Sequence, residues 1–304
     1  MIRIFKIFIF FSFLINVYGQ SEYIYVLGNV QDAGLPHIGC KHEFCKEKFN
    51  EFEEYFTTSI AVIDPLNKKY VLFEATPDLP YQLNYLDKKL FKNFFLPESI
   101  FITHAHIGHY AGLMYFGREA LASKDLKVNV LPKMANFLKT NGPWSQLVEI
   151  NNIKIQQINF GKKTNHLSNI TVTPIKVPHR DEYSETAAYV IIGKNKKALF
   201  IPDIDKWEKW EKNLRELVRK FDYLLLDATF YDSVEINRDI SEIPHPLVSE
   251  TISLLDNLSL KDKSKVYFIH MNHTNMMLDP KSNLSKYVIS KGFNIARLGL
   301  KLYL

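Results

Sequence analysis

Short apolar runs separated by turn residues dominate the first third of the chain. Residues 22–30, 57–64 and 68–77 are rich in β-forming residues and are bounded by Gly28, Pro65 and Asn67, which predicts strands and hairpins. Residues 79–95 mix apolar and charged positions at helical spacing and predict a helix. Residues 99–103 then predict a buried strand, followed by a loop and by a helix that begins near Tyr110.

The rest of the chain alternates strands with helices. Residues 207–220 predict an amphipathic helix with Leu214, Leu217 and Val218 on one face, and residues 246–258 predict another. We find no tandem repeat and no low-complexity linker, so the pattern favours a layered α/β or α+β domain. Further strands are expected at residues 128–132, 153–160, 170–177, 187–193, 197–202, 223–230 and 265–273, with a closing pair within 293–304.

Composition and the N-terminus bear on location more than on chemistry. The 304 residues are 46% hydrophobic and 23% charged, and the formal charge of +5 indicates neither nucleic acid nor an acidic partner. Residues 1–19 have the layout of a signal peptide: Arg3 and Lys6, an apolar run from Ile7 to Val17, then Gly19. An uncleaved anchor is the alternative, although the run is shorter than the about 20 residues of a membrane span. We expect a periplasmic or secreted protein, with a single domain at residues 20–304 and no stable membrane anchor after cleavage.

Three histidines follow the predicted strand at residues 99–103. His104 and His106 are two positions apart, so in extended chain both point to one side. His109 lies at the start of the following helix and can turn toward a neighbouring position. Imidazole is a common zinc ligand, and three histidines within six residues are hard to explain as solvated side chains. The cluster therefore predicts a metal site.

Further ligands of the same kind follow other apolar strands. His179 comes after residues 170–177, Asp203 after 197–202, and His270 within 265–273. Loops at strand ends on a rigid scaffold are where catalytic groups concentrate. We expect these three side chains to complete the site.

The order of these motifs resembles the metallo-β-lactamase superfamily. More narrowly, the segments VLGNVQDAGLPHIGC, FEATPDLPYQL, HAHIGHYAGL, LLLDATFYD and FIHMNHTN are similar to the branch that contains the coenzyme PQQ biosynthesis protein B. The resemblance runs from about Tyr23 to the C-terminus and implies a four-layer αβ/βα sandwich. It also implies a first metal on His104, His106 and His179, a bridging Asp203, and a second metal on His109 and His270.

Position 108 departs from the superfamily pattern. Gly108 stands where the motif usually carries an aspartate that binds the second metal. We therefore expect a mononuclear centre, with a weak, exchangeable second metal as the alternative. Metal content with and without Gly108→Asp would show whether that aspartate restores a second ion. Zinc is the expected metal, in one or two catalytic ions, with manganese or iron as alternatives.

A second group of metal-ligand type precedes the strands. Cys40, His42 and Cys45 form a CxHxxC arrangement where the same branch often carries a zinc knuckle. His273 is the candidate for the fourth ligand, because relatives in the superfamily divide such an HxxH pair between the active site and the knuckle. A Cys40–Cys45 disulfide is the alternative in an oxidising compartment. We expect one structural zinc here.

Four other polar residues lie near these motifs. His245 is a candidate general acid or substrate-binding group, with a surface or capping role as the alternative. Asp227 resembles a position that orients a ligand histidine. Asp32 and His37 lie in the loop before the knuckle, where loop packing is the simpler interpretation and lining of the cleft is the alternative.

Three functions remain open. The first is an exported hydrolase in which the metal activates water, Asp203 fixes it, and the small-molecule substrate is an ester, lactone or phosphodiester. The second is a metal-dependent oxidative role in the synthesis of PQQ or a related cofactor, against which export argues. The third is a non-catalytic metal-binding protein, against which the retained Asp203 argues.

Overall fold

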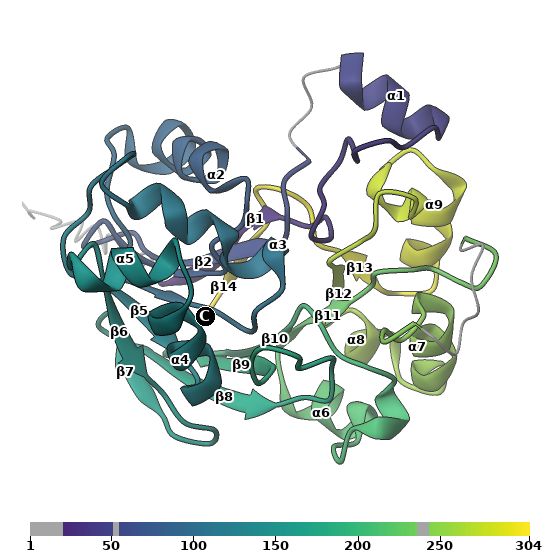
Figure 1. The fold of residues 1–304 in the computed structure, drawn as a ribbon. Helices are drawn as coiled ribbons and strands as arrows, with labels where there is room; N and C mark the ends of the chain where they lie inside the picture. The colour runs from purple at the N-terminus through teal and green to yellow at the C-terminus, as the bar shows by residue number, and fades with distance from the viewer. Residues whose placement is uncertain (1–20, 51–54, 236–242) are drawn as a thin grey trace, which may run out of the picture.

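Two sheets pack against each other between two layers of helices (Figure 1). The computed structural model describes residues 21–50, 55–235 and 243–304, so the predicted signal peptide lies outside the described residues. Apolar side chains form one core between the sheets and a further core between each sheet and its helices. These three apolar layers confirm the expected four-layer αβ/βα sandwich.

The first sheet contains seven strands, and α2 and α5 lie on its outer side in the left half of Figure 1. Its strands β14, β1, β2 and β3 pair antiparallel, whereas β3 to β6 run parallel. The order is β14 (Lys301–Tyr303), β1 (Tyr23–Gly28), β2 (Ser59–Asp64), β3 (Lys69–Phe73), β4 (Ser99–Phe101), β5 (Leu126–Val130) and β6 (Ile153–Gln157). The helices of this half are α2 (Leu79–Leu86), η1 (Asp87–Phe91), α3 (Ile107–Tyr110), η2 (Ala111–Phe116), α4 (Pro132–Thr140) and α5 (Trp144–Glu149).

The second sheet also contains seven strands, and its helices lie in the right half of Figure 1. Strands β10 to β13 run parallel to one another. The order is β13 (Asn294–Ile295), β12 (Val266–Ile269), β11 (Tyr223–Asp227), β10 (Lys197–Ile201), β9 (Ala187–Ile192), β8 (Ile170–Lys176) and β7 (Thr164–His166). The helices are α1 (Glu43–Asn50), η3 (Trp207–Lys209), α6 (Leu214–Lys220), α7 (Val248–Leu255), α8 (Leu260–Lys263), η5 (Met276–Leu278) and α9 (Asn283–Ser290).

Aromatic side chains hold the sheets together close to the histidine loop. The Phe73 and Tyr189 rings meet edge to face, 5.4 Å apart, and both side chains are fully buried. Burying a side chain of this size contributes about 1.5–3 kcal/mol. The Tyr189 hydroxyl donates a hydrogen bond of 2.6 Å to the carbonyl of Ile102, just before His104. The second sheet therefore fixes the loop that the first sheet carries.

The helix predicted at residues 207–220 is wrong in its extent. The chain forms the short η3, and then α6 begins only after Asn213. The Asn213 side chain accepts hydrogen bonds from the backbone N–H groups of Arg215 and Glu216, which makes it the N-cap of a new helix. The apolar face at Leu214 and Val218 is buried as expected.

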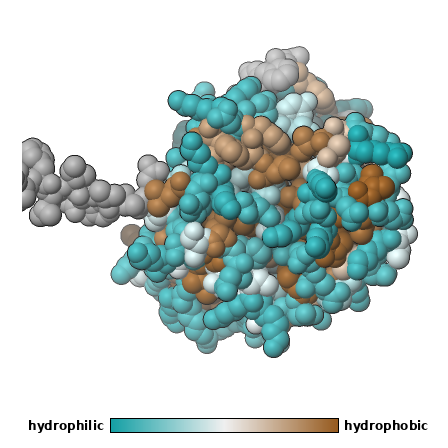
Figure 2. Space-filling model, turned by 90° about the vertical axis from the view of Figure 1, so that its left-hand side faces the viewer, coloured by the Kyte–Doolittle hydropathy of each residue, from teal (hydrophilic) through white to brown (hydrophobic). Residues whose placement is uncertain are grey.

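Figure 2 shows the face on the left of Figure 1, where hydrophobic surface is broken into patches by hydrophilic side chains. One apolar groove of about 340 Å³ lies between α2 and η2, lined by residues that include Leu83, Phe94 and Tyr115. Among the helices of the described ranges, none combines the length and apolarity of a membrane span.

Candidate metal centre

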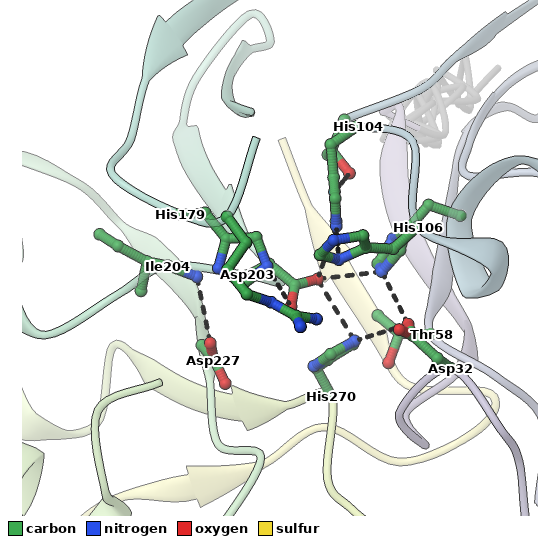
Figure 3. Close-up of polar contacts among 12 residues, drawn as sticks. Asp32, Thr58, His104, His106, His179, Asp203, Ile204, Asp227 and His270 are labelled. Atoms are coloured by element: carbon green, nitrogen blue, oxygen red, sulfur yellow. Dashed lines mark hydrogen bonds and ion pairs between the residues drawn. The ribbon is translucent and has the colours of Figure 1, made fainter. Parts of the chain in front are cut away.

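The ends of parallel strands from both sheets deliver the site residues to one edge of the sandwich. His104 and His106 follow β4, Asp203 follows β10, and His270 follows β12. Loops beyond the carboxyl ends of parallel strands are where such sheets bind their ligands. Figure 3 shows the labelled side chains converging from the two sheets.

The first group consists of His104, His106 and His179. Their ligand nitrogens lie within 4.8 Å of one another, and His104 Nε2 lies 2.8 Å from His106 Nδ1. The hydroxyl of Thr103 lies 2.8 Å from His104 Nδ1, which leaves Nε2 to face the group. Burial lowers the pKa of His104 well below its ordinary value and that of His179 to about 4. Both imidazoles are therefore neutral near pH 7 and have a lone pair for a cation.

Asp203 lies between this group and a second one. Its Oδ1 is 3.6 Å from His179 Nε2, whereas its Oδ2 is 2.9 Å from His109 Nε2 and 3.3 Å from His270 Nε2. Burial alone would raise the pKa of Asp203, but the charges of His270 and His109 outweigh it and hold the pKa well below its ordinary value. The carboxylate is ionised and faces both groups, as expected of a bridging ligand.

The second group contains a carboxylate that the sequence analysis assigned to loop packing. Asp32 Oδ1 lies 3.0 Å from His109 Nε2 and 3.4 Å from His270 Nε2. These three ligand atoms lie within 4.8 Å of one another. The signal in the sequence was the placement of Asp32 shortly after the strand of residues 22–30, but nothing local tied that strand end to His109.

Several buried polar atoms of the site lack a hydrogen-bond partner and are of the types that bind a cation. His109 Nε2, His179 Nε2, His270 Nε2, Asp203 Oδ2 and Asp32 Oδ1 are all buried without a hydrogen-bond partner in the described structure. An unpaired buried polar atom costs about 1–3 kcal/mol, so five in one place favour a common partner. Two imidazole-rich groups that share a carboxylate are the donor set of a zinc, manganese or iron centre.

A further set of hydrogen bonds surrounds the ligands. Thr229 Oγ1 lies 3.1 Å from His270 Nδ1 and donates to Asp227 Oδ1 at 2.7 Å. Asp227 Oδ2 lies 2.7 Å from His245 Nδ1 and accepts from the backbone of Ile204. Asp227 therefore orients a histidine, and the one it orients is His245. The Nδ1 of His245 lies 3.8 Å from Asp203 Oδ1, so His245 stands beside the site.

Solvent reaches the site on one side. The His106 side chain is 16% exposed and that of Asp32 is 21% exposed, whereas the other ligand side chains are buried. Glu182, half-exposed, lies 3.4 Å from His106 Nε2. A small molecule would approach the centre from the side of these residues.

Three of the four residues predicted for the knuckle lie together. The ligand atoms of Cys40, Cys45 and His273 lie within 4.8 Å of one another, and both cysteines are free thiols. The His37 ring stacks on that of His273, with centroids 3.9 Å apart. His42 is exposed, and its place in the knuckle stays a prediction.

Residues 69–271 match the family described as "Beta-lactamase superfamily domain". The match covers more than half of the chain, which therefore belongs to this family.

Within the family, the chain is similar to proteins named "Coenzyme PQQ synthesis protein B". The protein from Methylococcus capsulatus is 25% identical, with 92% of this chain and 99% of the relative aligned. The protein from Nitrosococcus oceani is 23% identical with the same coverage. The chain is thus a PqqB-like protein with the metallo-β-lactamase fold, as its sequence motifs indicated.

Solved structures agree on the fold. Zn(2+)-bound PqqB from Methylobacterium extorquens superposes with a TM-score of 0.77 at 19% identity, covering 93% of this chain and all of that one. A diphosphatase from the PhnP family superposes with a TM-score of 0.64 at 22% identity, covering 93% of this chain and 97% of that one. Yeast PDE1 superposes with a TM-score of 0.57 at 14% identity, covering 93% of this chain and 99% of that one.

Proposed function

We propose that this chain is a metal-dependent hydrolase of small esters, with phosphodiesters as the first class to test. The observation that carries the proposal is the pair of ligand groups that share Asp203, because one carboxylate lies between two sets of imidazoles that could each hold an ion. When bound, such ions lower the pKa of water toward neutrality and polarise the scissile bond.

The residues of the chain have separable tasks in this proposal. His104, His106 and His179 hold the first ion, and Asp203 accepts a hydrogen bond from the attacking water and orients it. His245 donates a proton to the leaving group, because Asp227 holds its Nδ1 and leaves Nε2 free. The exposed side at His106 admits the substrate.

Two relatives by fold support the choice of substrate class. They are the diphosphatase of the PhnP family and the yeast protein PDE1. Zinc is the first metal to test because the PqqB of Methylobacterium extorquens is zinc-bound. Manganese and iron suit the same nitrogen and oxygen donors. We also place one structural zinc on Cys40, Cys45 and His273, with His42 as its fourth ligand.

The test uses zinc-loaded protein and a panel of aryl phosphodiesters, carboxylic esters and lactones. We expect turnover of at least one class, and we expect His106→Ala to abolish it. Lys212→Ala, a partly exposed residue outside the site, is the matched control. An absence of turnover on the whole panel by folded protein with its metals bound would contradict the proposal.

Similarity along nearly the whole chain favours a second candidate, a role in the synthesis of PQQ or a related cofactor. Each of the three relatives with that name aligns over 92% of this chain and 99% of its own length. This candidate predicts metal-dependent oxygen consumption with a peptide or quinone precursor. Binding of the same compounds without turnover would instead favour the non-catalytic alternative.

We further propose that the protein is exported after removal of residues 1–19. Expression of the full chain in a bacterium, followed by N-terminal sequencing of the periplasmic fraction, tests this. A mature protein that begins at Gln20 is expected, and full-length protein confined to the cytoplasmic fraction would contradict it.

A further inference from the structure

Gly108 and Asp32 occupy mutually exclusive positions. A Cβ atom at Gly108 would lie 2.6 Å from Asp32 Cα and 2.8 Å from Asp32 Cγ, and it would overlap Asp32 Oδ1. Real Cβ atoms do not approach other atoms so closely, and the Cα belongs to backbone that cannot rotate away. The absence of a side chain at position 108 therefore makes room for the carboxylate of Asp32.

The backbone holds Asp32 and His270 in one register. The N–H of Gln31 donates to the carbonyl of Met271 at 2.8 Å, and the N–H of Met271 donates to the carbonyl of Asn29 at 2.8 Å. Asp32 directly follows Gln31, and His270 directly precedes Met271. The position of the Asp32 carboxylate beside His270 is thus fixed by a main-chain ladder rather than by a chance side-chain conformation.

The second group gathers acidic side chains around His109. Asp32 and Asp203 both direct an oxygen at His109 Nε2, at 3.0 and 2.9 Å. On the other side of the same ring, Glu74 Oε1 lies 3.5 Å from His109 Nδ1, and Glu74 is fully buried. Two carboxylates around two imidazoles form a donor set for a divalent ion.

We propose that Asp32 supplies the carboxylate ligand of a second metal ion, in place of a side chain at position 108, so that the centre binds two divalent ions on either side of Asp203. The inference rests on the metal centre of the proposed function and does not depend on its substrate. It reverses the expectation of a mononuclear centre. It also reverses the use of Gly108→Asp as a restoring variant, because Asp32 already fills that space.

The experiment counts ions per chain by elemental analysis after zinc loading and dialysis, and measures the affinity of the weakest ion in the centre. Asp32→Asn keeps the size of the side chain and removes its charge. We expect it to bind one ion fewer than wild type, or to bind the last ion at least about tenfold more weakly, since partners one shell further out already contribute that much. Asp181→Asn, an exposed carboxylate two positions after His179 in the sequence, is expected to keep the wild-type count.

Gly108→Asp tests the role of position 108. Its Cβ would meet the Cα of Asp32, so this variant is expected to bind no additional ion. An unchanged count and affinity in folded Asp32→Asn would overturn the inference. If neither variant folds, anomalous diffraction from zinc-loaded wild type decides: an ion coordinated by Asp32 supports the inference, and an Asp32 without an ion overturns it.

The outcome is independent of the hydrolase proposal. If Asp32→Asn binds one ion fewer than wild type but wild type hydrolyses nothing, the second metal site is supported and the proposed function is contradicted. If wild type hydrolyses esters and Asp32→Asn has an unchanged ion count, the proposed function is supported and only this inference is contradicted.

Discussion

The two halves of the centre are built in different ways. In the first half, His104 and His106 are two positions apart, the hydroxyl of Thr103 contacts a ring nitrogen of His104, and one ligand, His179, comes from a distant segment. In the second half, Asp32, His109 and His270 come from three distant segments that only the folded chain brings together. The first half depends mostly on local spacing and the second on tertiary packing, so changes to the two halves should have separable effects.

The largest expected effect is the loss of a ligand from the first half. His106→Ala removes a nitrogen from the group that holds the first ion. We expect hydrolysis to fall by more than about 100-fold, since residues that only support ligands already contribute about 10- to 100-fold. Steady-state kinetics of zinc-loaded protein checks this. Activity within threefold of wild type would remove His106 from the centre.

A smaller loss is expected from the second half. Asp32→Asn leaves the three histidines of the first group in place, so we expect kcat to fall by about 10- to 100-fold, less than in His106→Ala. The comparison uses both variants at saturating zinc with the same substrate. If Asp32→Asn were the more severe variant, the second half would hold the principal ion.

Two buried threonines offer a matched pair of supporting residues. The hydroxyl of Thr103 contacts His104 Nδ1 at 2.8 Å, and that of Thr229 contacts His270 Nδ1 at 3.1 Å. Thr103→Val is expected to weaken the first ion and Thr229→Val the second, each by about tenfold. Zinc titration against a competing chelator measures the affinities of the first and second ions separately. If either variant weakened the binding of both ions equally, the two halves of the centre would not be separable.

The smallest expected effect is a shift of the pH profile. Burial lowers the pKa of His245, but the Asp227 carboxylate and its hydrogen bond outweigh this, so the pKa is raised. A general acid acts protonated, and activity falls as the pH rises through its pKa. Asp227→Asn removes the charge that raises this pKa, so the alkaline limb should move to lower pH by about one to two units, given about 1.5–3 kcal/mol for a charged hydrogen bond. An unshifted alkaline limb would exclude His245 as the acid.

The sequence predicted those parts of the molecule that depend on local pattern. The strands that carry His104, Asp203 and His270 are apolar runs, and the ligand follows each run directly. The break after η3 was missed because the apolar periodicity continues across Asn213, whose capping hydrogen bonds appear only in three dimensions.

The role of Asp32 could not be predicted from local pattern either. Gly108 indicated a missing ligand, but the replacement comes from a segment much earlier in the chain, placed by the main-chain pairing of its neighbours with Met271. The strand of residues 22–30 gave no sign of which strand end it would meet. A search for an acidic residue after each predicted strand would have included Asp32 among the candidates.

The most direct test of the account is to remove the metals with a chelator, add zinc back in steps, and measure bound ions and phosphodiester hydrolysis in the same samples. We expect no turnover by the stripped chain and a rise in turnover as the two groups that share Asp203 bind zinc. Undiminished hydrolysis by the stripped chain, or none by the zinc-saturated chain, would contradict it.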